Sequence, residues 1–140
     1  MRILGIDLGE KRIGLAISDE LGITAQGLPT VLCTVEKDDL EKIKDIVNHY
    51  GVEKIVLGLP RNMNGTLGKQ AEKVLSFAHN LKNICDIQVE LEDERLSTAK
   101  AERLLIEMDR SRKKRKKVID KMSAVIILQS YLDRRMMNNR

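Results

Sequence analysis

The first nineteen residues of the chain constrain its fold more than any other stretch. They read MRILGIDLGEKRIGLAISD, in which a short apolar run ends at a single carboxylate, Asp7. A break at Gly9 and the two residues after it is followed by alternating apolar residues from Ile13 to Ile17. This pattern predicts two antiparallel strands joined by a tight turn, with a positive φ at Gly9. Because the first strand is apolar on both faces, we expect it to be central in its sheet and covered on both sides.

Asp7 closes this buried strand, where an unpaired carboxylate is energetically costly. Such a group is typical of a cation site or a catalytic site. The alternative is a structural role, in which the Asp7 carboxylate accepts hydrogen bonds from the backbone of the turn. This stretch alone does not decide between the two.

The composition indicates one globular domain over residues 1–140. A chain of 140 residues can bury one sizeable core, and 42% hydrophobic with 33% charged residues is an ordinary mixture. Aromatic residues make up only 2%, which argues against a stacking platform for single-stranded bases. The sequence shows no signal peptide and no bilayer-spanning run, and Cys33 and Cys85 lack a metal-ligand spacing. We therefore expect a cytoplasmic protein with reduced thiols and no membrane partner.

Strand and helix patterns alternate along the rest of the chain. The patterns predict strands at 28–35, 54–59 and 87–91, and helices at 37–50, 67–83, 97–108 and 118–136. Alternation in the second half implies parallel pairing, whereas the opening hairpin is antiparallel. The predicted fold class is α/β, with a mixed five-stranded sheet and helices on both faces.

Three acidic residues are the candidate catalytic and metal-binding groups. Asp7 ends the first strand, Glu94 follows the last one, and Asp120 opens a C-terminal helix that is apolar nearly all round. Ligand sites form where the carboxyl ends of parallel strands meet, and Asp7 and Glu94 would share that edge. Converging carboxylates repel one another unless a cation neutralises them, and oxygen ligands suit Mg²⁺ or Mn²⁺. Such a metal supports phosphodiester cleavage.

A structural interpretation of the same acids stays open. Glu94 and Asp120 also have basic residues close to them in the sequence, namely Arg95, Lys116 and Lys117. Salt bridges to these residues would account for both acids without a metal.

A basic run at residues 110–117 carries seven positive charges and no negative one. Without these charges the net charge of +4 would become −3, so the cationic character belongs to one segment. Such a run is typical of a nucleic-acid contact, and like charges resist ordering, so we expect a mobile loop between two helices. The alternative is a solvated connector. The candidate phosphate-binding residues are Arg112, Lys113, Lys114, Arg115, Lys116 and Lys117.

A second candidate contact is the loop at residues 58–68, between a predicted buried strand and a helix. Loops in this position can offer backbone N–H groups to a phosphate. The loop lacks the Gly-Lys-Ser/Thr triplet of a Walker A motif. Arg61 and Lys69 are its candidate phosphate ligands, although a solvated loop explains both residues equally well.

Four motifs in order along the chain resemble the RuvX (YqgF) family of resolvases and nucleases. The resemblance covers essentially all 140 residues. The motifs are GIDLG at 5–9 continuing into RIGLA at 12–16, GLP at 58–60 with Gly65 and Gly68, DERLST at 93–98, and Asp120 with Ala124, Ile127, Leu128, Gln129 and Tyr131.

The resemblance implies a ribonuclease H-like fold and a metal-dependent nuclease, with Asp7, Glu94 and Asp120 as its catalytic acids. It implies maturation of the 5′ end of the 16S ribosomal RNA precursor. Many ribonuclease H-like relatives carry a further acid at the end of the fourth strand, where this chain has Leu59-Pro60-Arg61. The number of bound metal ions is therefore left open.

Other functions remain as alternatives. Resolution of Holliday junctions in branched DNA needs two sites related by two-fold symmetry, so a dimer is a condition for that activity. The sequence shows no obvious interface, and we expect a monomer or a weak homodimer. A non-catalytic RNA-binding factor would use the basic run and not the acids. The strand–Asp–x–Gly turn also opens actin-like sugar kinases, but those need two lobes and this chain has the length of one.

Overall fold

A computed structural model describes residues 1–62, 64–94 and 112–138, and for 112–121 it gives the course of the helix but not the side chains. The predicted helix at 97–108 lies outside these residues. The elements are β1 (Arg2–Leu8), β2 (Arg12–Ser18), β3 (Ala25–Leu32), α1 (Glu36–Tyr50), β4 (Val52–Leu59), α2 (Lys69–Cys85), β5 (Gln88–Asp93) and α4 (Arg112–Asn138).

The five strands form one mixed sheet in the order β3-β2-β1-β4-β5. β1 pairs antiparallel with β2 and parallel with β4, and β4 pairs parallel with β5. The expected opening hairpin and the central position of the first strand are both confirmed. This topology brings the carboxyl ends of β1, β4 and β5 to one edge of the sheet.

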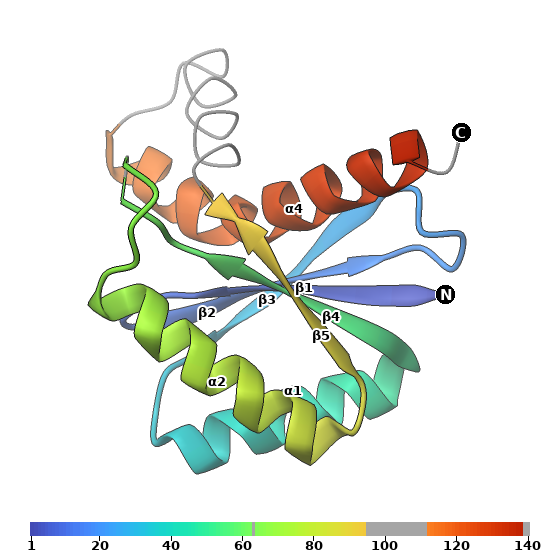
Figure 1. The fold of residues 1–140 in the computed structure, drawn as a ribbon, viewed down its shortest axis with the longest axis horizontal. Coiled ribbons are helices and arrows are strands. Elements are labelled where there is room, and N and C mark those ends of the chain that lie inside the picture. The colour runs from blue at the N-terminus through green and yellow to red at the C-terminus, as the bar shows by residue number, and fades with distance from the viewer. Residues whose placement is uncertain (63, 95–111, 139–140) are drawn as a thin grey trace.

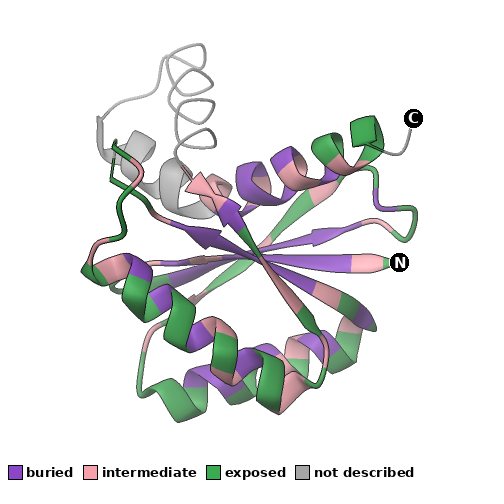
Figure 2. Cartoon of the chain, viewed as in Figure 1, coloured by how far each residue is buried: buried purple, intermediate pink, exposed green. Residues whose placement is uncertain are grey.

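Helices cover both faces of the sheet, as the sequence predicts. Figure 1 shows α1 and α2 below the sheet and α4 across its other face. The buried residues accordingly form two cores, and Figure 2 shows the central strands buried between them. The smaller core lies under α4 and consists of Ile3, Ala16, Val56, Ala124, Ile127, Leu128 and Leu132.

The turn between β1 and β2 corrects the expectation about Gly9. The glycines with a positive φ in the described residues are Gly22, Gly51 and Gly65, so Gly9 does not need a left-handed conformation. Its N–H donates a 3.0 Å hydrogen bond to the Arg12 carbonyl, and a Cβ at Gly9 would lie 2.6 Å from that oxygen. The glycine is required by this close approach of the backbone.

β3 begins three residues earlier than predicted. The Asp19 carboxylate accepts hydrogen bonds from the N–H groups of Ile23 and Thr24, at 2.7 and 2.9 Å, which makes the connection short. Ser18 therefore pairs with Ala25, and the strand ends at Leu32. Pro29 is tolerated because β3 is an edge strand, where a missing N–H donor leaves no partner unpaired.

α4 corrects the prediction of a mobile loop over the basic run. The helix begins at Arg112, so residues 112–117 form its first turns and not a connector. Arg and Lys have high helix propensity, and extending an existing helix costs far less than starting one. The later turns of α4, which pack on the sheet, therefore stabilise the helix through residues 112–117 despite their like charges.

The other bounds differ from prediction by two residues or fewer, as helix and strand ends commonly do. Within the described residues, we find no helix with the length and apolar character that crossing a membrane requires.

Candidate active site

Asp7 and Glu94 come from strands on either side of β4. Asp7 is the next-to-last residue of β1, and Glu94 directly follows β5. Ile6 pairs with Leu57 and Asp93 with Leu59, so both acids reach the same end of β4. Both side chains are half-buried.

The carboxyl groups of Asp7 and Glu94 share a hydrogen bond, and the pKa of Glu94 is raised. Burial, as the largest cause, together with the hydrogen bond and the negative charge of Asp7, raises the pKa of Glu94 from its ordinary value of 4.5 to about 8. The charge of Asp93 adds to the effect. At neutral pH and without a cation, Glu94 is therefore protonated, and its O–H group donates a hydrogen bond to the Asp7 carboxylate.

The alternation of β5 explains why Glu94 turns toward α4. Glu90, Glu92 and Glu94 are two residues apart and so lie on one face of the strand. Glu90 forms a 3.1 Å ion pair with Lys54, and the buried Glu92 pairs with Arg134 of α4. Glu94 continues this row toward the edge of the sheet, on the face that α4 covers.

Polar contacts along α4 fix the helix on this face. The Tyr131 hydroxyl accepts a 3.1 Å hydrogen bond from Lys54. The Gln129 side chain accepts a 2.9 Å hydrogen bond from the Ala25 N–H and donates one of 3.0 Å to the Ile23 carbonyl. α4 is thus held against β3 and β4 at once, which sets the direction in which its first turns leave the sheet.

The third predicted acid, Asp120, has a side chain outside the described residues. Its position precedes the fully buried Ala124 by four residues and the buried Ile127 by seven. Helical periodicity therefore places position 120 on the stripe of α4 that faces the sheet. Among the described side chains, no three of His, Cys, Asp or Glu gather in one place, and Asp120 is not in that set.

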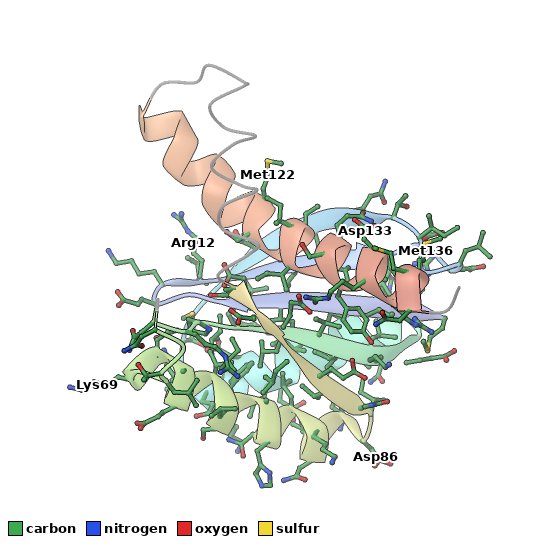
Figure 3. The ribbon with its side chains drawn as sticks, turned by 45° about the horizontal axis from the view of Figure 1, so that its top comes forward. Arg12, Lys69, Asp86, Met122, Asp133 and Met136 are labelled. Atoms are coloured by element: carbon green, nitrogen blue, oxygen red, sulfur yellow. The ribbon has the colours of Figure 1, made fainter. Side chains whose placement is uncertain are left out.

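The predicted phosphate ligands Arg61 and Lys69 lie near the same edge. The Arg61 guanidinium is 3.9 Å from the Asp93 carboxylate and donates a 3.4 Å hydrogen bond to the Gly65 carbonyl. Lys69 is the exposed first residue of α2. Figure 3 shows Lys69 and Arg12 at the end of the molecule opposite Asp86 and Met136. The side chains of Arg112 to Lys117 lie outside the description.

Two residues at this edge were missed from the sequence. Gln70 donates a 2.8 Å hydrogen bond to the carbonyl of Leu8, which holds the end of β1 beside Asp7. No local pattern marks a glutamine for such a contact. Asp93 raises the pKa of its neighbour Glu94 and forms an ion pair with Arg61. Its position directly before a candidate catalytic acid was the sequence signal that could have identified it.

The raised pKa of Glu94 predicts a pH-dependent stability. In EDTA, the folded protein keeps the Glu94 proton up to about pH 8, whereas the unfolded chain loses it near 4.5. The free energy of unfolding should therefore fall as pH rises between these values, by up to about 1.4 kcal/mol per pH unit. Glu94→Gln cannot titrate, and urea unfolding from pH 5 to 9 should show a shallower fall for this variant. Parallel curves for the two proteins would contradict the assignment.

Comparison with known proteins agrees with this geometry. Residues 1–134 match the family described as "RuvX: Holliday junction resolvase". A relative from Bacillus mycoides (strain KBAB4) is 56% identical over 135 residues, covering 95% of this chain and 98% of the relative. A relative from Clostridium kluyveri (strain ATCC 8527) is 54% identical over 134 residues, covering 96% of this chain and 98% of the relative. Both carry the name "Putative pre-16S rRNA nuclease".

Solved structures share the fold at low sequence identity. RuvC of T. thermophilus, in complex with a Holliday junction substrate, superposes with a TM-score of 0.62 at 12% identity, covering 98% of this chain and 96% of RuvC. The fowlpox virus Holliday junction resolvase gives a TM-score of 0.57 at 16% identity, and the match covers 95% of this chain and 99% of the resolvase. The predicted α/β fold of the ribonuclease H-like resolvases is thus confirmed. From the match over residues 1–134 and the identity to its relatives, this chain belongs to the RuvX family.

Proposed function

We propose that this protein is a metal-dependent nuclease that hydrolyses phosphodiester bonds in the 5′ region of the 16S ribosomal RNA precursor. Asp7, Glu94 and Asp120 are its catalytic acids. The observation that carries the proposal is the contact between the Asp7 and Glu94 carboxyl groups at the carboxyl ends of the strands. A carboxyl group with a strongly shifted pKa beside a second acid is typical of a catalytic site.

The donor set fits a hard divalent cation. Two carboxyl groups in contact share one proton in the metal-free protein, and a Mg²⁺ or Mn²⁺ ion would take its place with oxygen ligands from both. Asp120 would supply the third carboxylate from the stripe of α4 that faces the sheet. When bound, the ion would activate a water molecule and stabilise the leaving oxygen. The chain itself places the acids and half-buries them, which strengthens their interaction with a cation.

The substrate is argued from the relatives and from charge. Relatives above 50% identity over almost their whole length bear the pre-16S rRNA nuclease name. The first turns of α4 concentrate positive charge on the helix that carries Asp120. Nucleic acid bound there would contact phosphates, which fixes its position without reading its sequence.

A Holliday junction is the second candidate substrate. The family description and the fold similarity to RuvC and the fowlpox enzyme favour it. Symmetric cleavage of a four-way junction would require two copies of this chain.

The decisive experiment incubates the purified protein with Mg²⁺ or Mn²⁺ on a ribosomal RNA precursor fragment and on a four-way DNA junction. We expect cleavage of the RNA that EDTA abolishes and added Mg²⁺ restores. Cleavage of the junction alone would favour the second candidate. Binding of RNA without cleavage under any metal condition would assign the chain to the non-catalytic class.

The basic start of α4 predicts a change in the salt dependence of binding. The test variant replaces three lysines at the start of α4 with Gln, which keeps the helix propensity. These are Lys113, Lys114 and Lys116. Each lost phosphate contact should flatten the log–log slope of affinity against salt by about 0.7 to 0.9, and so by up to about 2.7 in total. Filter binding of the RNA fragment at several salt concentrations measures the slope.

A second triple variant provides the matched control. Lys37, Lys42 and Lys82 are exposed on α1 and α2, on the other face of the sheet. Replacing them by Gln removes the same net charge, and the slope should stay near that of the wild type. Equal slopes in the two triple variants would show that the effect is general charge and not contact by α4.

A further inference from the structure

Gly58 of β4 lies between the two acids, on the face that α4 covers. An added Cβ at this position would lie 2.6 Å from Cδ1 of Ile127 and 3.0 Å from Cγ of Glu94, and closer still to Oε1 of Glu94. The Glu94 carboxyl group therefore fills the space that a side chain at position 58 would take. Asp7 lies beside it, because β1 pairs with β4 up to Ile6 and Leu57.

The backbone gives no other reason for a glycine here. Gly58 is not among the described glycines with a positive φ, so other residues could adopt its conformation. A glycine inside a strand is destabilising relative to larger residues and often marks the close approach of another group. At Gly58 the approaching groups are the Glu94 side chain and Cδ1 of Ile127.

We infer that Gly58 is a positioning residue, and that the space above its Cα seats the Glu94 carboxyl group beside Asp7. The expected effect on metal binding rests on the proposed function. The placement of the Glu94 carboxyl group above Gly58 does not. With a side chain at position 58, Glu94 would have to move outward, away from Asp7, and the two carboxylates would no longer face the same point.

Gly5 of β1 provides a matched control. An added Cβ at Gly5 would lie 2.7 Å from Cβ of Leu128 and 3.2 Å from the Ala124 carbonyl oxygen. Gly5→Ala therefore also disturbs the packing of α4, and none of the three atoms nearest to its added Cβ belongs to either acid. Damage that comes only from displacing α4 should appear in both glycine variants.

The first measurement tests the seat through thermal unfolding in EDTA. Every protein compared carries Ile127→Val, which removes Cδ1, the other atom that would crowd a Cβ at position 58. Gly58→Ala is then introduced in two backgrounds, one that keeps Glu94 and one with Glu94→Ala, where the crowding atoms of Glu94 are absent. We expect the fall in Tm to be at least halved by Glu94→Ala, while the fall caused by Gly5→Ala is the same in both backgrounds. An equal fall in Tm for Gly58→Ala in both backgrounds would show that the Glu94 side chain does not fill the space above Gly58.

The second measurement tests positioning through titration with Mn²⁺. We expect Gly58→Ala to bind Mn²⁺ at least tenfold more weakly than its Gly58 parent, and Gly5→Ala to bind within twofold of that parent. Mn²⁺ affinity unchanged by Gly58→Ala would overturn the positioning role. A parent protein that binds no Mn²⁺ would contradict the proposed function, and the unfolding measurement would still decide whether Gly58 seats Glu94.

Discussion

Asp7→Asn is expected to abolish cleavage of the RNA fragment while leaving the fold intact. The amide is nearly the same size as the carboxylate but is a poor ligand for Mg²⁺. The loss should reach about a thousandfold in rate, which corresponds to about 4 kcal/mol of transition-state stabilisation. Because the substitution removes a negative charge facing Glu94, the variant should be as stable as the wild type or more stable. Single-turnover cleavage and thermal unfolding measure the two effects.

Asp86→Asn is a suitable control for this experiment. Asp86 is exposed at the C-terminal end of α2, far from the site, in a left-handed conformation that asparagine also tolerates. Cleavage by the control should match the wild type. Wild-type cleavage by Asp7→Asn would mean that Asp7 only supports the turn, and the metal-site proposal would fail.

Glu94→Gln and Asp120→Asn are expected to act as a unit. If both acids hold the same metal ion, each single variant should lose nearly all activity, about a thousandfold, and the double variant should lose little more. Two acids in separate salt bridges would instead give mild losses that add. Single-turnover rates of the four proteins separate these cases.

Asp133→Asn controls for a general effect of acids on α4. Asp133 is exposed in a later turn of that helix and accepts a 2.9 Å hydrogen bond from Gln129. Its substitution should leave the cleavage rate within about twofold of the wild type, as for exposed residues away from a site. A loss as large as that of Asp120→Asn would indicate that α4 as a whole, and not the acid at position 120, limits activity.

The sequence by itself determined the fold class, the central strand and the position of two acids. These follow from local signals: the apolar run before Asp7, the turn after it, and the alternation of strand and helix patterns up to Glu94. The rule that ligand sites form at the carboxyl ends of parallel strands then brought Asp7 and Glu94 to one edge. The structure bears out this placement, whereas the catalytic role of both acids stays a prediction.

Only the tertiary structure decided how these elements meet. The shared hydrogen bond of Asp7 and Glu94, the seat above Gly58 and the Gln70 contact to Leu8 join residues far apart in the chain, which no local pattern specifies. The start of α4 at Arg112 was also missed, because charge repulsion within the run was weighed without the packing of Ala124 and Leu128 on the sheet. Local periodicity reports which residues are buried, but the partner of each buried group depends on the packing of the whole chain.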